Sequence, residues 1–350
     1  MIEQALVGAA AVTLVSFVGT GWALRLARRR SILAHPNERS SHSAPTPSGG
    51  GLGLGLTAVL GLALAGFAAE TMGGERALLW AALPVALACW VGWRDDVRPL
   101  PALAKLAVLT VAAGTLVALR RFDAVEIPGL GSVEFGVLTL PLMLFWLAGF
   151  TNAFNFMDGI DGIAGLTAAV SGLVYAASGM ASDVSAVVAL GVIIAGSAVG
   201  FLPWNFPRAR IFMGDAGSLV LGLLLAFTAV VADVAGSLSF PASVLLLGPF
   251  IFDASITLVR RAIRGERVWR AHREHLYQRL ARIWGAHAPV SLLYAAFSVA
   301  CGVLALAYDG LGTSGRLLSL GGPLAAMLAF AALVLVIDRR RRKALRVAEN

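Results

Sequence analysis

The sequence predicts an all-α, polytopic integral membrane protein, a helical bundle of about 11 transmembrane helices. Of its 350 residues, 58% are hydrophobic and only 14% are charged, and the mean hydropathy is +0.80. The apolar residues lie in long runs rather than in amphipathic stripes, and they are too many for one soluble core. Runs of about 17 to 25 apolar residues cross the hydrocarbon as helices, and the alternating pattern of a β-barrel is missing.

Eleven apolar runs are expected to form the spans. The first begins after Glu3 and its basic residues follow it, which is the reverse of a cleavable signal peptide, so we expect it to be retained. Cys89 and Cys301 fall within two of the runs and give neither a disulfide framework nor metal-ligand spacing. The runs cover residues 4–26, 49–69, 77–93, 101–119, 137–153, 162–180, 185–202, 217–234, 241–259, 288–307 and 318–337.

The basic residues predict the orientation of these spans. Only Arg76, Arg120, Arg121 and Arg316 fall in loops on one side, and the other 24 of the 28 Lys and Arg residues fall on or beside the other side. Short loops rich in Lys and Arg stay in the cytoplasm, so the N-terminus is expected outside and the C-terminus inside. The net charge of +8 then faces anionic lipid headgroups, and no nucleic-acid partner is expected.

Every distinctive polar motif falls on the predicted cytoplasmic side. We therefore expect residues 1–338 to form a single transmembrane domain whose active-site loops are 31–48, 94–100, 152–162, 203–217 and 260–287, followed by a basic tail at 339–350. The loops carry the motifs HPNERSSHSAPTPSGGG, RDDVRP, NAFNFMDGIDG, PWNFPRARIFMGDAGS and RRAIRGERVWRAHREHLYQRL. The outer loops, such as GMASD and YDGLGTSGR, carry nothing comparable. Separate parts of the chain thus deliver acids, amides, histidines and arginines to one face of the membrane.

The acids in these loops favour a divalent metal ion and phosphate chemistry. A carboxylate near hydrocarbon costs several kcal/mol unless it is paired, hydrated or bound to a metal. Aspartates without a soft ligand nearby suit Mg²⁺ or Mn²⁺ better than Zn²⁺, and such an ion usually keeps phosphate oxygens as further ligands. The basic residues of 260–275 and the glycines of 49–51 and 214–217 supply positive charge and open backbone N–H groups. The pattern therefore indicates phosphoryl transfer.

Simpler structural roles remain open for the same motifs. The two aspartates of RDDVRP can end a solvated helix, the glycines of DGIDG can break one, and GDAGS can cap the next. His272 and His275 are three residues apart and can form a polar surface pair on a helix. Lys105 can neutralise a phosphate or extend to the membrane surface. The basic residues 339–346 can act only as an anchor on the cytoplasmic side.

In order and spacing, these motifs resemble a known family. NAFNFMDGIDG, FMGDAGS, the aspartate pair after the third span and the inner histidine loop are similar to those of the polyprenyl-phosphate N-acetylhexosamine-1-phosphate transferases, glycosyltransferase family 4. That family includes the phospho-MurNAc-pentapeptide translocase of peptidoglycan synthesis, and the resemblance covers residues 35–280. It implies a Mg²⁺-dependent transfer of sugar-1-phosphate from a UDP-N-acetylhexosamine to undecaprenyl phosphate in the bacterial inner membrane, with release of UMP. A homodimer is compatible with it.

The resemblance also implies roles for single residues. It gives the catalytic set as Asp95, Asp96, Asp158, Asp161, His272 and His275, and the metal ligands as Asp215 and Asp158. Asp95 and Asp96 would lie beside the incoming lipid phosphate, where one of them would either deprotonate that phosphate or only position it. Substrate binding is expected from Asn152, Asn155, Asn205 and Arg273, and also from Arg39, His42, Thr46 and Lys105.

Departures from the family pattern narrow the expected substrate. The loop AHREHLYQRL lacks the consecutive histidines of the cell-wall translocase, which favours the branch that starts O-antigen and other surface glycans. Muramyl-pentapeptide transfer stays as the alternative. Ser48 stands where many relatives carry a basic residue, so no phosphate contact is expected there.

Two interpretations from other classes are weaker. A transporter would place its acids at the bilayer midplane and in repeated halves, whereas these acids cluster at one edge and the sequence has no internal repeat. An inactive scaffold would not need the full set of acids.

Overall fold

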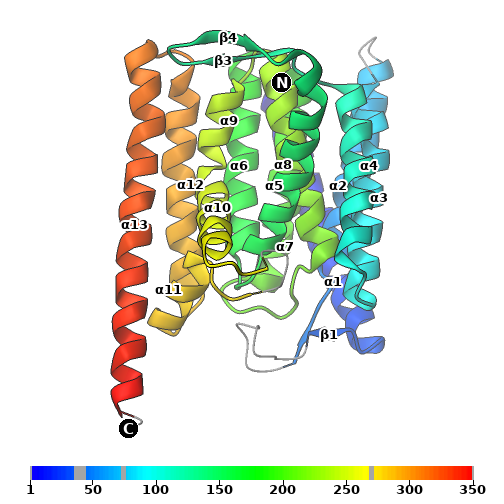
Figure 1. The fold of residues 1–350 in the computed structure, drawn as a ribbon. Coiled ribbons are helices and arrows are strands. Elements are labelled where there is room, and N and C mark those ends of the chain that lie inside the picture. Colours follow the sequence, from blue (N-terminus) through cyan, green and yellow to red (C-terminus); the bar gives the residue numbers. More distant parts are fainter. Residues whose placement is uncertain (1, 35–44, 72–75, 268–271, 349–350) are drawn as a thin grey trace.

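The computed structural model describes residues 2–34, 45–71, 76–267 and 272–348. Within these ranges the chain is a bundle of long helices that run side by side, with two short β-hairpins (Figure 1). The helices are α1 (Ile2–Arg29), α2 (Gly51–Thr71), α3 (Ala77–Val97), α4 (Ala102–Leu119), α5 (Thr139–Met157), α6 (Ile163–Ala181), α7 (Ser185–Asn205), α8 (Asp215–Val234), α9 (Phe240–Leu246), α10 (Gly248–Ile263), α11 (Leu276–Trp284), α12 (Ala288–Tyr308) and α13 (Thr313–Ala348).

The prediction of a multi-pass helical membrane protein is confirmed. Over the described ranges, 10 helices are long and apolar enough to cross a membrane, and the bent pair α9 and α10 brings the number to 11 if it counts as one span. The start of α1 and the end of α13 lie at opposite ends of the bundle, as an odd number of crossings requires (Figure 1). Which end is cytoplasmic stays a prediction from the basic residues.

Several helices extend further than predicted, among them α3 and α7, whose extensions carry motif residues. The third span was expected to end at residue 93, but α3 continues to Val97 and so carries both aspartates of RDDVRP. The seventh was expected to end at residue 202, but α7 continues through Pro203 to Asn205. These motif residues lie on helix ends, which fixes their positions more firmly than a loop would.

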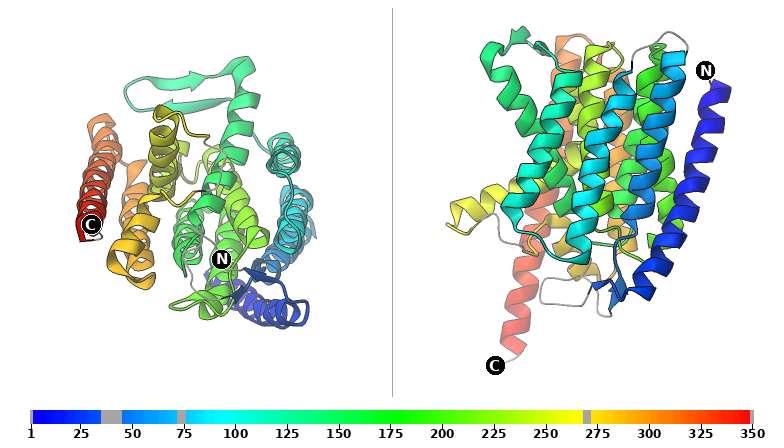
Figure 2. Two further views of the ribbon diagram at one scale, coloured as in Figure 1. Left: turned by 60° about the horizontal axis from the view of Figure 1, so that its bottom comes forward. Right: turned by 90° about the vertical axis from the view of Figure 1, so that its right-hand side faces the viewer.

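The span expected over 241–259 is bent rather than a single continuous helix. The chain breaks at Leu247, and α9 and α10 meet there at an angle of 75°. Pro249 lies in the first turn of α10, where a proline starts a helix and cannot continue one. As a result α10 leaves the bundle sideways (Figure 2). The loop expected at 260–287 also contains a helix, α11.

Two antiparallel hairpins complete the described fold. Strands β1 (Leu33–Ala34) and β2 (Thr46–Pro47) pair beside the end of α1. Strands β3 (Ala124–Ile127) and β4 (Gly131–Glu134) pair at the opposite end of the bundle, and a 3-10 turn (Gly136–Leu138) leads from them into α5 (Figure 1). The second hairpin lies in a segment that the sequence treated only as an outer loop.

Helix α8 forms the centre of the bundle. All of its residues from Ala216 to Ala232 are buried, and it packs against α2, α3, α5, α6 and α7. Glycines bring the backbones of three helices together at its first turn. A Cβ atom on Gly51 of α2 would lie 2.2 Å from the Gly217 nitrogen, and one on Gly92 of α3 would lie 2.5 Å from the Ala216 nitrogen. Small residues allow such close helix contact, and here they bring the end of α3 beside the start of α8.

Candidate active site

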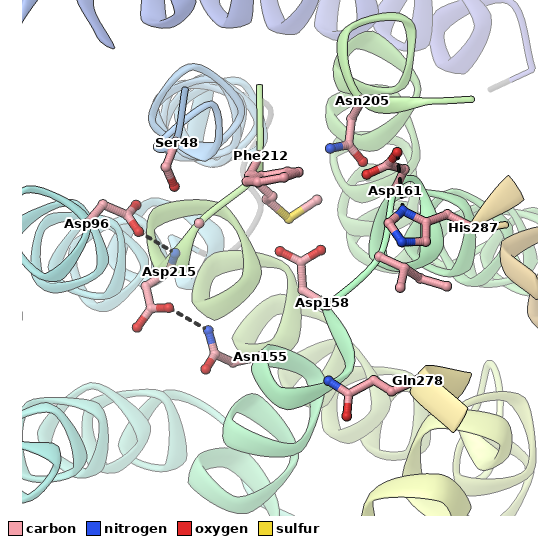
Figure 3. Close-up of a pocket in the computed structure, with 14 residues that line it drawn as sticks. Ser48, Asp96, Asn155, Asp158, Asp161, Asn205, Phe212, Asp215, Gln278 and His287 are labelled. Carbon is pink, nitrogen blue, oxygen red and sulfur yellow. Dashed lines mark hydrogen bonds and ion pairs between the residues drawn. The ribbon is translucent and has the colours of Figure 1, made fainter. Parts of the chain in front are cut away.

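A cavity of about 320 Å³ opens at the end of the bundle that the sequence places in the cytoplasm (Figure 3). Segments that are far apart in the sequence contribute to its wall: the end of β2, the ends of α3, α5 and α7, the start of α8, α11 and the loop before α12. The lining residues are Ser48, Asp96, Asn155, Asp158, Gly159, Ile160, Asp161, Asn205, Phe212, Met213, Gly214, Asp215, Gln278 and His287. The five predicted cytoplasmic loops therefore each supply part of one site.

Asp96 holds the first turn of α8. Its two carboxylate oxygens accept the backbone N–H groups of Asp215 at 2.9 Å and of Ala216 at 3.1 Å. These N–H groups have no partner within the helix, and the helix dipole favours a negative charge at this end. Gly214 approaches closely, since a Cβ atom there would lie 2.5 Å from the Asp96 carboxylate. Asp96 therefore fixes where Asp215 stands.

Asp215 lies in a network of charged and polar groups. Its Oδ2 accepts a hydrogen bond from Lys105 Nζ at 2.7 Å, and its Oδ1 accepts one from Asn155 Nδ2 at 2.9 Å. Lys105 also contacts Asp95 Oδ2 at 3.0 Å, so its ammonium group bridges two carboxylates. Asn155 donates a second bond to Ser218 Oγ at 2.8 Å. The lysine points inward to the acids, which favours a role in charge neutralisation over extension to the membrane surface.

Asp158 is the cavity carboxylate whose side chain has no partner among the described residues. It follows the last turn of α5, points into the space between the other acids (Figure 3), and forms no side-chain hydrogen bond or ion pair with the residues that the structure describes. Burial raises its pKa to about 7, and the negative charges of Asp215 and Asp161 add to the rise. A cation between these acids would relieve that repulsion.

The donor set fits a magnesium-type ion that takes its remaining ligands from the substrate. No group of three or more His, Cys, Asp or Glu side chains forms a complete metal site within the described ranges. Asp158 and Asp215 nevertheless face the same cavity with oxygen ligands only. Mg²⁺ is commonly bound through one or two carboxylates together with substrate phosphates. The two acids predicted as metal ligands are therefore suitably placed.

Asp161 and His287 form the opposite wall. His287 Nδ1 lies 3.3 Å from Asp161 Oδ2, and Ser291 on α12 donates a hydrogen bond to the Asp161 carbonyl at 2.7 Å. His287 was not among the predicted site residues. In the sequence it is one histidine before an apolar run, and only the packing of α12 against the DGIDG loop reveals its place in the cavity.

Two of the predicted asparagines form their hydrogen bonds with backbone groups. Asn205 is buried, accepts the Gly162 N–H group at 2.7 Å and donates to the Ile211 carbonyl at 3.0 Å. It therefore joins the DGIDG loop to the segment before α8, at the cavity wall. Asn152 donates to the carbonyl of Ala148 in its own helix at 2.7 Å and does not line the cavity. Their predicted contacts with substrate stay predictions.

The histidine loop lies beside the cavity. His275 is 2% exposed, stands at the start of α11 and places Nδ1 3.3 Å from Asp253 of α10. His272 stacks on it with ring centroids 4.9 Å apart, and burial, followed by His275 and Arg261, lowers its pKa to about 4. His272 is thus neutral at physiological pH. Neither histidine lines the cavity, and neither does Arg273.

Asp253 was also missed, and it anchors α11. This carboxylate is 1% exposed and accepts the N–H groups of Leu276 at 2.8 Å and Tyr277 at 3.0 Å, and the hydroxyl of Tyr294 at 2.5 Å. Tyr277 in turn donates its hydroxyl to the Phe156 carbonyl at 2.9 Å. An acid inside an apolar run was a usable signal in the sequence, because such groups are rarely incidental.

The last predicted positions surround the glycine triplet. Thr46 lies on β2 and is partly buried, and Ser48, two residues later, is the one that reaches the cavity. Backbone bonds join this segment to the start of α8, from the Phe212 N–H group to the Pro47 carbonyl at 2.9 Å. Arg39 and His42 lie outside the described residues.

Comparison with known proteins identifies the family. Residues 78–233 match glycosyl transferase family 4. The decaprenyl-phosphate N-acetylglucosaminephosphotransferase of Mycobacterium leprae (strain TN) is 35% identical over 325 residues, which cover 83% of this chain and 80% of the relative. The probable undecaprenyl-phosphate N-acetylglucosaminyl 1-phosphate transferase of Bacillus subtilis (strain 168) is 27% identical over 272 residues, or 75% and 73% of the two chains. The phospho-N-acetylmuramoyl-pentapeptide-transferase of Leuconostoc citreum (strain KM20) is 30% identical over 227 residues, or 61% and 71%. The chain belongs to glycosyl transferase family 4, among the phosphotransferases that transfer N-acetylhexosamine-1-phosphate to polyprenyl phosphates.

Proposed function

We propose that this enzyme transfers N-acetylhexosamine-1-phosphate from a UDP-sugar to undecaprenyl phosphate, with Mg²⁺ as cofactor and UMP as the leaving product. The observation that carries the proposal is the convergence of Asp96, Asp158 and Asp215 on one cavity at an end of a membrane bundle. A lipid phosphate lies at the level of the headgroups, so only a site at this depth lets it meet a nucleotide sugar from the cytoplasm.

Some residues of the cavity position the catalytic acids, and others offset the negative charge of the substrate phosphates. Asp96 sets the first turn of α8 and thereby the position of Asp215. Asp158 and Asp215 would hold the metal ion, which when bound offsets the negative charge of the diphosphate. Lys105 places a positive charge 2.7 Å from Asp215, which limits repulsion between the acids and the incoming phosphates. Together these groups favour attack of the lipid phosphate on the sugar-linked phosphorus.

The sequence of the histidine loop supports surface-glycan initiation, such as that of O-antigen, over peptidoglycan synthesis. The chain carries Tyr277 and Gln278 in a stretch that lacks consecutive histidines. A Cβ atom on Gly159 would lie 2.1 Å from the Tyr277 hydroxyl oxygen and 3.2 Å from Gln278 Nε2. The close packing of Tyr277 and Gln278 against Gly159 sets the shape of the cavity beside the DGIDG loop. Muramyl-pentapeptide transfer is the second candidate, favoured by the relative from Leuconostoc citreum.

The test uses the full chain purified in detergent with Mg²⁺, undecaprenyl or decaprenyl phosphate, and a panel of UDP-N-acetylhexosamines with UDP-MurNAc-pentapeptide. UMP release and the mass of the lipid product are followed. We expect product with undecaprenyl phosphate and one N-acetylhexosamine. Product only with the muramyl donor would establish the second candidate. A preference for decaprenyl phosphate would show that the proposed acceptor, undecaprenyl phosphate, is wrong.

The variant Asp215→Asn tests the metal assignment. Loss of one charged ligand should reduce kcat by about a hundred-fold or more, since a bound metal contributes several kcal/mol in the transition state. The control is Asp123→Asn, which makes the same charge change on an exposed residue near the β3–β4 hairpin. Wild-type kcat in folded Asp215→Asn would contradict the assignment.

A further inference from the structure

A second cavity, of about 580 Å³, lies between the end of α10, α11 and the basic end of α13. Figure 1 shows α11 beside the lower half of α13, and the two helices are in contact. No residue that lines this second cavity also lines the candidate active site. The lining residues are Arg260, Arg279, Leu335, Val336, Asp338, Arg339, Arg342 and Lys343. Five of these eight side chains carry a positive charge and one carries a negative charge.

Asp338, and Glu274 beside the cavity, pair with only some of these cations. Asp338 is buried and binds both Arg279 and Arg342, the latter at 3.1 Å. Arg260, Arg339 and Lys343 form no hydrogen bond or ion pair with any residue in the described ranges. Arg260 is only partly exposed, and both cations (Arg264 and Arg279) and carboxylates (Glu274 and Asp338) act on it, although it pairs directly with neither carboxylate. Such a group gains most from an anion that enters the cavity.

The cavity lies where apolar residues give way to charged ones. Leu335 and Val336 form part of its wall, and the apolar run of α13 ends at Ile337, which only Asp338 separates from the basic residues 339–343. On α10, the neighbours of Arg260 include Val259, which is 52% exposed, and Ile263, which is 80% exposed. Exposed aliphatic side chains on a membrane protein face lipid tails. A ligand here therefore meets hydrocarbon on one side and guanidinium groups on the other.

We propose that this cavity binds the phosphate-bearing headgroup of an anionic membrane phospholipid. Arginine matches phosphate because its planar group donates two parallel hydrogen bonds, and basic pockets between helices on the cytoplasmic side bind such headgroups. Leu335 and Val336 accommodate the start of the acyl chains. A soluble phosphate would satisfy the charges but would leave this apolar wall without a partner.

The bound headgroup also stabilises the packing of α11. Arg279 is buried, binds Asp338 of α13, and donates from Nε to the Glu274 carbonyl at 2.8 Å and from a terminal nitrogen to a Glu274 carboxylate oxygen at 2.9 Å. An anion beside Arg260 and Arg279 reduces the repulsion between α10, α11 and α13. The melting temperature of the protein should therefore rise with the lipid, independently of catalysis.

The test measures lipid retention by native mass spectrometry and the melting temperature in detergent. The purified full chain is mixed with phosphatidylglycerol, phosphatidylcholine or inorganic phosphate. The variant is Arg260→Gln with Arg339→Gln. The control is Arg29→Gln with Arg340→Gln, which removes the same charge from two exposed residues outside the cavity. Arg339→Gln alone, at an exposed and unpaired position, serves as a milder second variant.

The wild-type chain should retain phosphatidylglycerol over phosphatidylcholine and melt at a higher temperature with it. The double variant should bind phosphatidylglycerol about thirty-fold more weakly, since each basic residue near an anionic lipid contributes about a factor of five. The control should resemble the wild type, and Arg339→Gln should lose about five-fold. Equal losses in variant and control would overturn the proposal. So would stabilisation by inorganic phosphate as strong as that by phosphatidylglycerol, or displacement of phosphatidylglycerol by undecaprenyl phosphate in preference to other lipids.

Discussion

Asp253→Asn should release α11 from the bundle while leaving the long helices in place. In the native protein, four donors in and around α11 and α12 converge on this buried carboxylate. An asparagine keeps the size of the side chain but replaces one acceptor oxygen by an NH₂ donor. If that donor takes the Oδ2 position, it meets the Tyr277 N–H group and the Tyr294 hydroxyl, which are 3.0 and 2.5 Å away.

The size of the effect follows from these contacts. A hydrogen bond to a charged group contributes about 1.5 to 3 kcal/mol, so loss of two would cost about 3 to 6 kcal/mol. The Tyr294 hydroxyl can rotate and accept a bond from the new NH₂ group, which places the expected cost near the lower limit, about 3 kcal/mol. That is about a hundred-fold change in the equilibrium between docked and undocked α11.

Hydrogen exchange followed by mass spectrometry measures this equilibrium directly. Backbone amides of residues 276–284 should exchange about a hundred-fold faster in Asp253→Asn, and the KM for the sugar nucleotide should rise because Gln278 lines the cavity. Asp309→Asn is the matched control, since Asp309 also accepts a backbone N–H group, that of Ser239, at 2.9 Å. Unchanged exchange of α11 in a folded Asp253→Asn protein would refute the anchoring role.

Two further substitutions test the geometry of the cavity. Gly92→Ala places a methyl group 2.5 Å from backbone atoms of Asp215 and Ala216. The variant should therefore lower the free energy of unfolding by about 1 to 3 kcal/mol and reduce turnover, with little loss of helix by circular dichroism. Gly114→Ala is the control, since its nearest neighbour is 3.8 Å away, and it should change neither stability nor turnover. His287→Gln should raise the KM for the sugar nucleotide more than His272→Gln does, because His287 lines the cavity and His272 does not. Wild-type turnover in Gly92→Ala, or a larger effect at His272, would show that the arrangement of the cavity is misunderstood.

The membrane fold could be predicted because bilayer thickness sets the length of each apolar run. The same regularity grouped the loops that are predicted to be cytoplasmic, since every second connection falls on one side. The break between α9 and α10 could not be predicted from the length of the apolar run. Its apolar run is continuous, and only Pro249 signals that a second helix starts there.

The site was predicted where chemistry shows in the residue types and missed where it depends on packing. Asp96, Asp158 and Asp215 stood out as acids beside lipid, and the structure brings them to one cavity. His287 reaches that cavity only because α12 packs on the DGIDG loop. His275 was expected among the catalytic residues, but its ring lies against Asp253, 22 residues earlier in the chain, a pairing that no local pattern shows.

The glycine contacts at the start of α8 carry a practical consequence. The acids meet because α2, α3 and α8 touch through their backbones at Gly51, Gly92 and Gly217, without side chains that could fill a widened gap. A detergent that lets these helices separate by the width of a methyl group would inactivate the enzyme while every helix stays folded. The circular dichroism spectrum would then be unchanged. Only a turnover assay, or calorimetry of nucleotide binding, would detect the loss of activity.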